Sequence, residues 1–238
     1  MSDRNRTTSY IFRSYVNSFA YLYQDAEYLH QIANKPELAK TFELVRLCRT
    51  ALLLYVFSLE GLINRALDHF MSQHLREFIL ERENRFGIED KWLFLPLVVS
   101  EKETFNTSKY PWSHFAELIS VRNDFVHPKH DRPVYYRAIT SHVWEPLPWN
   151  QIPDDLDAKE TDLIYRQTRI PKDPYAIRPD HIDRVKKVVD DIVAELDRLL
   201  GGRITENNWL RKDEMNLIYP PDAKLVDLAS IPSNKKAD

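Results

Sequence analysis

Apolar residues along this chain recur at spacings of three and four, which is the period of an α-helix with one buried face. The longest stripe starts at Leu38 and reaches Ala66, so we expect a long helix that extends to about residue 82, with a kink near Gly61. An aromatic-rich stretch over residues 9–33 predicts another helix directly before it. Two long helices in succession favour an antiparallel hairpin at the start of a helical bundle.

Three shorter apolar segments follow along the chain. Residues 89–100 hold large apolar side chains interrupted by a proline, and we expect a short helix or turn packed under the bundle. A helix over residues 111–127 is predicted to stop before Pro128, because proline clashes with the preceding turn and has no backbone N–H. The last stripe predicts a helix over residues 181–200 that ends at a Gly-Gly pair.

The segment between the last two helices has a different composition. Residues 128–180 contain 8 of the 14 prolines, and the stretches 134–144 and 161–170 alternate well enough to predict short strands. We therefore expect a mainly α fold: an up-and-down bundle of four to five helices in one domain over residues 1–202. The proline-rich segment is an insertion before the last helix, a β-hairpin or a loop. Residues 203–238 are expected to form a C-terminal tail whose end is disordered.

Composition narrows the class of protein. The chain has 238 residues and a formal net charge of −3, so any nucleic-acid site must be local. Only 4 glycines are present and no glycine-rich phosphate loop occurs, which argues against a nucleotide site of that type. The single Cys48 excludes an internal disulfide, and no apolar run is long enough to span a bilayer. We expect a soluble, cytoplasmic protein that needs no cofactor.

The strongest chemical signal is the hexapeptide Arg122-Asn123-Asp124-Phe125-Val126-His127. It combines a permanently charged guanidinium, a small amide and an imidazole that titrates near neutral pH. The imidazole can move a proton and the guanidinium can hold charge that develops on a phosphate, as metal-free attack on a phosphodiester requires. Three fixed letters at this spacing occur by accident in roughly one chain in a hundred, and such residues at a helix end are more often solvated or capping. The setting of the hexapeptide must therefore decide.

Helix geometry bears on how these groups can act together. On an ideal helix Asn123 and His127 lie about 40° apart around the axis, whereas Arg122 and His127 lie about 140° apart. One straight helix therefore does not aim both charged groups at one narrow cleft, unless its end departs from the ideal helix, which Pro128 favours. A second copy of the helix across a two-fold axis would bring two arginines and two histidines to one groove, which predicts a homodimer.

The setting of the hexapeptide resembles the HEPN superfamily (higher eukaryote and prokaryote nucleotide-binding). The resemblance covers about residues 9–130 and the final helix. It rests on an aromatic-rich first helix, the stretch Ser58–Asn64 in a long second helix, then Lys91-Trp92, and then Phe115–Val121 running into R-N-x-x-x-H. Its specific part is the R-x4-6-H signature with a polar residue directly after the arginine.

The resemblance implies a homodimeric, metal-independent endoribonuclease, since many members are such nucleases and serve as toxins or as effectors of antiviral defence. Arg122 would bind the scissile phosphate, Asn123 would orient a neighbour, and His127 would transfer a proton. The products would be a 2′,3′-cyclic phosphate and a 5′-hydroxyl, and the partners RNA and an antitoxin or nucleotidyltransferase protein. Some members keep the fold without cleavage, so the alternative is a non-catalytic helical module that binds a nucleotide, RNA or a protein.

Further polar residues surround the hexapeptide. Glu60 and Asn64 lie four residues apart beside the apolar stripe of the long helix, and with Asp124 they are candidate supporting residues. Glu60 and Asn64 can equally be ordinary surface positions. The local basic run after the hexapeptide is a candidate RNA-binding surface: Lys129, His130, Arg132 and Arg137. A solvated loop explains this run as well.

A metal site is the weaker hypothesis for the same region. Its ligands would be Asp124, His127, His130 and Asp131. Pro128 interrupts the helix that would align them, and ligand types without a confirmed geometry are weak support. We therefore expect no metal.

Overall fold

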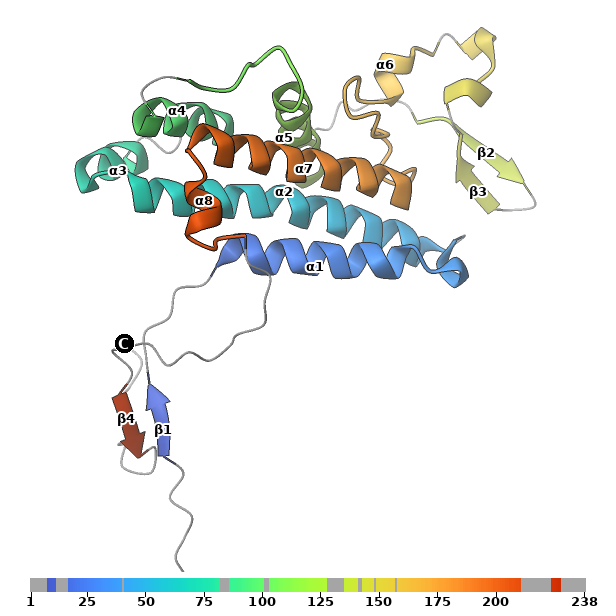
Figure 1. Cartoon of the computed structure of the whole chain (residues 1–238). Helices are drawn as coiled ribbons and strands as arrows, with labels where there is room; N and C mark the ends of the chain where they lie inside the picture. The colour runs from blue at the N-terminus through green and yellow to red at the C-terminus, as the bar shows by residue number, and fades with distance from the viewer. Residues whose placement is uncertain are drawn as a thin grey trace, which may run out of the picture. The chain divides into compact units, whose positions relative to one another are not determined.

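The computed structural model divides the chain into two units (Figure 1). Residues 17–212 form the larger unit, and residues 1–16 with 213–238 form the smaller one. The structure describes residues 8–11, 17–39, 41–81, 86–100, 103–127, 135–140, 143–147, 149–156, 158–210 and 224–227.

In the described part of the larger unit, five helices build the body. They are α1 (Ser18–Ala33), α2 (Phe42–Phe70), α4 (Ile88–Ser100), α5 (Trp112–Val126) and α7 (Pro179–Leu199). The shorter helices are α3 (Gln73–Leu80), α6 (Glu160–Leu163) and α8 (Arg203–Glu206). Figure 1 shows α1, α2 and α7 alongside one another, which confirms the predicted mainly α helical bundle. None of the described helices combines the length and apolar character that a membrane span requires.

The pair α1 and α2 packs closely along most of α1. Asn17 and Thr41 cap the two N-termini, and each side chain accepts a hydrogen bond from a backbone N–H three residues on. α2 runs unbroken through Gly61, where a Cβ atom would lie 2.9 Å from the Cβ of Ser18 and 3.1 Å from the backbone nitrogen of Phe19. The missing side chain therefore lets α1 approach the backbone of α2.

The long second helix is shorter than predicted. It ends at Phe70, because Met71 adopts an extended conformation with φ −97° and ψ 148°. Ser72 then caps α3 by accepting a hydrogen bond from the N–H of Leu75 at 3.5 Å. The prediction of one helix to about residue 82 is therefore wrong, since a serine cap starts a new helix. α4, in contrast, continues through Pro96 as one helix.

The core lies where α2, α4, α5 and α7 meet. Leu59 on α2 and Ile192 on α7 are fully buried. Trp92 on α4 and Phe115 on α5 are also fully buried, with ring centres 5.0 Å apart. Cys48 belongs to the same cluster, and burial raises the pKa of its thiol to about 11. The thiol therefore stays protonated and acts as a small apolar side chain.

The smaller unit is described at two strands, β1 (Thr8–Ile11) and β4 (Lys224–Asp227). They pair antiparallel, with Thr8 opposite Asp227. The prediction of a helix over residues 9–33 is therefore wrong at its start, because this backbone pairs with a segment from the far end of the sequence. In the tail, Trp209 is buried in the larger unit, and the expected disordered end lies outside the described residues.

The insertion between α5 and α7 contains a hairpin. Its strands β2 (Arg137–Thr140) and β3 (Val143–Pro146) pair antiparallel, so the predicted strand over residues 134–144 is two short strands instead. The second predicted strand, over residues 161–170, is wrong. Its first half is α6, and its second half is a turn in which Arg169 has a φ of 60°. A tight turn at this position overrides the alternating pattern.

Candidate functional site

The hexapeptide forms the last turns of α5. The helix ends at Val126, before Pro128, as predicted. His127 closes the helix: its backbone N–H donates to the carbonyl oxygen of Asn123 at 2.8 Å, while its φ of −121° and ψ of 68° leave the helical region. The carboxyl end of α5 therefore fixes the backbone position from which the His127 side chain extends.

Arg122 reaches from α5 to α2, where Glu60 binds it. Its Nη2 donates to Glu60 Oε2 at 2.5 Å, and its Nη1 donates to Asn123 Oδ1 at 2.9 Å. The guanidinium carbon lies 5.4 Å from the ring centre of Phe57, one turn before Glu60, within the range of a cation–π contact. The Arg122 side chain is 16% exposed. A carboxylate, an amide and an aromatic ring thus hold the guanidinium between two helices.

Arg122 keeps unused hydrogen-bonding capacity in this position. A guanidinium has five N–H donors, and each terminal nitrogen spends one of its two on the bonds above. The Nε of Arg122 is buried and donates to no described residue. A fixed guanidinium with spare donors is suited to bind an oxyanion, because planar N–H pairs match phosphate and carboxylate geometry.

One turn further along α2, Asn64 faces α4. The Nζ of Lys91 donates to Asn64 Oδ1 at 3.0 Å, and Lys91 is only 7% exposed. Asn64 therefore holds Lys91 rather than Arg122. Since Glu60 and Asn64 are i,i+4 neighbours, one face of α2 holds two cations, one from α4 and one from α5.

Two acidic residues of α5 bind the insertion. The hydroxyl of Tyr165 donates to Asp124 Oδ2 at 2.5 Å. Glu117 Oε2 accepts from the backbone N–H groups of Gln167 and Thr168 at 2.9 and 2.6 Å, and from the Thr168 hydroxyl at 2.8 Å. Asp124, which we expected to support Arg122, is thus bonded to the insertion. α5 presents its arginine to α2 and its acids to the insertion.

His127 is exposed, and its side chain has no hydrogen bond, ion pair or ring contact with any described residue. Within the described chain no contact joins it to Arg122. Arg137 pairs with Asp173 at 3.4 Å and lies over the ring of Tyr135 at 5.7 Å. The other candidate RNA-binding residues lie outside the described part: Lys129, His130 and Arg132.

The described residues provide no set of ligands for the hypothetical metal site. Among the residues whose positions are described, no three His, Cys, Asp or Glu side chains form a group that could hold a metal ion. Two of the proposed ligands, His130 and Asp131, are not among those residues.

Sequence reasoning missed three residues of this region. Phe57 precedes Glu60 by three residues and so lies on the same helix face, a spacing that identifies it once Glu60 is chosen. Lys91 belongs to a segment that carries the resemblance to the HEPN superfamily, but the sequence does not indicate that it pairs with Asn64. Glu117 binds backbone N–H groups of a turn, and such partners leave no side-chain pattern in the sequence.

No family model, curated protein or solved structure matches this chain. The chemistry of the site therefore rests on its own geometry. That geometry provides an anchored guanidinium and, at the end of the same helix, an accessible imidazole, which are groups for binding phosphate and moving protons.

Proposed function

We propose that this chain is a metal-independent endoribonuclease of HEPN type, active as a homodimer. The observation that supports this most is the position of Arg122, fixed on α2 by Glu60, with His127 accessible at the end of the same helix. The R-x4-6-H spacing and the helical body add to this support. The anchored arginine and the accessible histidine divide the work between binding and proton transfer.

The proposed reaction is attack of a ribose 2′-hydroxyl on the adjacent phosphorus. His127 of one protomer takes the proton of the 2′-hydroxyl, the 2′-oxygen bonds to phosphorus, and the bond from phosphorus to the 5′-oxygen breaks. Solvent water gives a proton to the leaving 5′-oxygen and the resulting hydroxide takes back the proton held by His127, so that a 2′,3′-cyclic phosphate and a 5′-hydroxyl result. Arg122 stabilises the extra negative charge on the phosphate, and Asn123 holds its guanidinium in position. DNA is not a substrate, because it lacks the 2′-hydroxyl.

Ideal helix geometry supports the proposed homodimer. Arg122 and His127 lie about 140° apart around an ideal helix, so a phosphate held by one arginine is reached more easily by the histidine of a second copy. An antitoxin or a nucleotidyltransferase is the proposed protein partner that would keep such a nuclease inactive in a cell.

The first test is RNA cleavage by the purified protein with a chelator present. His127→Ala is expected to lower the rate about 100- to 10,000-fold, the usual range for loss of a general acid–base group. His74→Ala is the matched control, because His74 is an exposed histidine on α3 and should be dispensable. Far-UV circular dichroism checks that both variants fold. Wild-type cleavage that stops on metal removal, or equal rates for the two variants, would contradict the proposal.

A complementation experiment tests the shared cleft. Arg122→Gln and His127→Ala are each expected to be inactive, but a mixture of the two should regain part of the wild-type rate. A mixed dimer contains one intact arginine and one intact histidine in different protomers. Two inactive variants that stay inactive together, although they exchange subunits, would refute a cleft built from both copies.

A second candidate function is a non-catalytic helical module that binds a nucleotide, RNA or a protein. It is favoured by one observation: Glu60 and Asn123 already engage the Arg122 guanidinium within the single chain. This function predicts no turnover and unchanged partner binding after His127→Ala. Growth arrest on expression that His127→Ala relieves would favour the nuclease.

A further inference from the structure

Two cavities adjoin the insertion, and they share one residue, Tyr135. The first has a volume of about 520 Å³ and lies within the insertion and against the start of α7. The second has a volume of about 500 Å³ and lies between the insertion, α2 and α5. Both volumes are in the range of small-molecule sites, and neither cavity is lined by Arg122 or His127.

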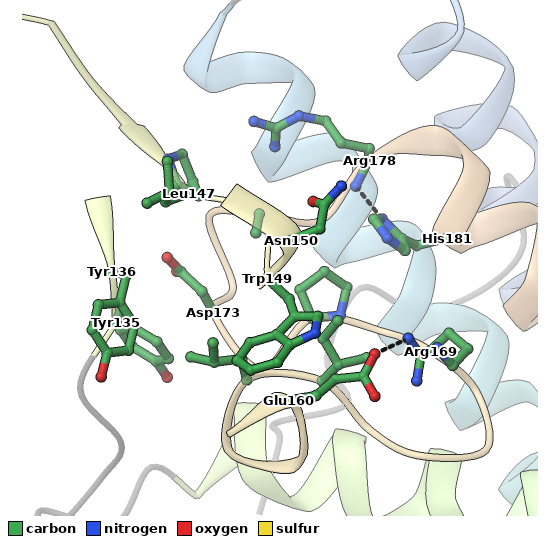
Figure 2. Close-up of a pocket in the computed structure, with 15 residues that line it drawn as sticks. Tyr135, Tyr136, Leu147, Trp149, Asn150, Glu160, Arg169, Asp173, Arg178 and His181 are labelled. Carbon is green, nitrogen blue, oxygen red and sulfur yellow. Dashed lines mark hydrogen bonds and ion pairs between the residues drawn. The ribbon is translucent and has the colours of Figure 1, made fainter. Parts of the chain in front are cut away.

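The first cavity, named the ring cavity, is walled by Tyr135, Tyr136 and Trp149. Figure 2 shows the indole of Trp149 in the middle, with both tyrosines on one side of it. The hydroxyl of Tyr135 donates to the carbonyl oxygen of Lys172 at 3.2 Å, and that of Tyr136 to the carbonyl oxygen of Leu156 at 3.3 Å. These bonds hold the rings in place, so the cavity offers preformed aromatic faces for stacking.

The ring cavity is lined by two acidic side chains, Glu160 and Asp173, and by two basic ones, Arg169 and Arg178, so the formal charges of its lining sum to zero. Glu160 and Arg169 form an ion pair on the other side of Trp149, as Figure 2 shows. Asp173 pairs with Arg137 at 3.4 Å. The Nδ1 of His181 accepts a backbone N–H at 3.0 Å, which requires that nitrogen to be unprotonated. A cavity with aromatic walls and no net charge suits an uncharged, planar ring.

The second cavity, named the cationic cavity, is lined by Arg46, Arg49 and Lys172. In the described part of the chain none of these three forms an ion pair. Arg49 lies over the ring of Tyr175 at 5.3 Å, which fixes its guanidinium. One carboxylate, Asp124, also lines the cavity, and the Nζ of Lys172 donates to the carbonyl oxygen of Thr161 at 2.6 Å, so Arg46 and Arg49 are the main phosphate-binding groups. This cavity suits a negatively charged group such as a phosphate.

We propose that the two cavities together bind one nucleotide, with its base in the ring cavity and its phosphate in the cationic cavity. Tyr135 lines both cavities and would lie beside the sugar that joins base and phosphate. The nucleotide is either free in solution or an unpaired unit of an RNA strand, since the two share the same base and phosphate. Asp124 and Phe125 of the hexapeptide line the cationic cavity, but Arg122, Asn123 and His127 line neither cavity, and nucleotide binding does not depend on cleavage.

Calorimetric titration of the full chain tests the ring cavity. The probes are the four nucleoside 5′-monophosphates, the matching nucleosides, and a 2′-O-methyl RNA tetranucleotide. Trp149→Leu is expected to weaken binding of its best monophosphate about tenfold, because base–aromatic stacking is lost. Tyr28→Leu, which removes an aromatic that is 63% exposed on α1, is the matched control and should bind as the wild type. Should Trp149→Leu fail to fold, Tyr136→Leu makes the same test.

The cationic cavity is tested by comparing monophosphates with nucleosides. The double variant Arg46→Gln, Arg49→Gln is expected to weaken the monophosphate about tenfold and to leave nucleoside binding unchanged. Arg76→Gln, an arginine on α3 outside both cavities, is the matched control. An equal loss for nucleoside and monophosphate would overturn the assignment of the phosphate to this cavity.

The 2′-O-methyl probe separates this proposal from the nuclease proposal, because it cannot form a cyclic phosphate. Tighter binding of the tetranucleotide than of any monophosphate, by tenfold or more, supports the site with a strand as its ligand. Equal affinities for the tetranucleotide and the best monophosphate support the site with a free nucleotide as its ligand. No saturable binding of any probe, or equal affinities for Trp149→Leu and Tyr28→Leu, would overturn the site even if RNA cleavage were found.

Discussion

The helical body and the insertion are held by different kinds of contact. In the body, apolar side chains such as Leu59 and Ile192 are fully buried among the packed helices. The insertion shares this core through Ile170 and Ile177, which are fully buried, and it is bound to α5 by single polar side chains as well, Glu117 and Asp124. Apolar burial is spread over area, whereas a hydrogen bond depends on one atom in one place. The stability of the body should therefore depend on buried side-chain volume, whereas the contact between the insertion and α5 should also depend on single polar atoms.

The largest expected effect is on the body. Leu59→Ala should lower the free energy of unfolding by about 2–5 kcal/mol, because it removes buried contacts and leaves a cavity. The matched control is Leu97→Ala on α4, whose side chain is 48% exposed, with an expected change within about 0.5 kcal/mol. Urea denaturation followed by circular dichroism measures both. Similar values for the two leucines would remove the basis for the comparison.

An intermediate effect is expected where α5 meets the insertion. Glu117→Gln keeps the shape of the side chain but removes the charge that strengthens three hydrogen bonds, so local stability should fall by about 1–3 kcal/mol. Amide hydrogen exchange should speed up at Gln167 and Thr168 while the amides of α2 stay protected. Glu77→Gln, on the exposed surface of α3, is the control and should change neither. Faster exchange throughout α2 would show that insertion and body are not separable.

The smallest effect concerns pH at the junction of insertion and α7. Burial, with Arg178 and Arg184 acting in the same direction and Asp180 opposing, lowers the pKa of His181 from its ordinary 6.5. The unfolded chain therefore binds this proton more readily. The contribution of uncharged His181 to the free energy of unfolding is complete above about pH 6.5, and it is lost as the pH falls toward the lower pKa of His181 in the folded state.

The measurement for His181 is the melting temperature across this pH range. The wild type should lose stability on acidification, and His181→Gln should show a shallower loss. His74→Gln, in an exposed position on α3, is the control and should keep the wild-type slope. A wild-type slope in His181→Gln would show that other groups cause the acid sensitivity.

The same comparison explains how much of the fold could be predicted from the sequence. The apolar residues on the buried faces of α2 and α7 repeat with every helical turn. Each helix could therefore be predicted from its own sequence, without knowledge of the helices that pack against it. β1 was not predicted, because its partner β4 lies at the far end of the sequence. The turn at Arg169 was mistaken for a strand, because an alternating pattern does not report a positive φ.

The candidate site was predictable to a similar degree. The hexapeptide and Glu60 were chosen from residue type and spacing. Whether Glu60 or Asn64 meets Arg122 depends on how α2 packs against α5, which no single helix reveals. The two cavities depend on where the insertion folds back, and one of its contacts with the body, between Glu117 and the backbone N–H groups of Gln167 and Thr168, leaves no side-chain pattern in the sequence.

Gly61 has a consequence for the register between α1 and α2. It is the single glycine in α2, so α1 finds bare backbone at one level of that helix only. If α1 slid by a turn, Ser18 would meet a side chain where it now meets none. The close approach at Gly61 therefore favours the present alignment of the pair, in which Glu60, the residue next to Gly61, has a defined offset from α1.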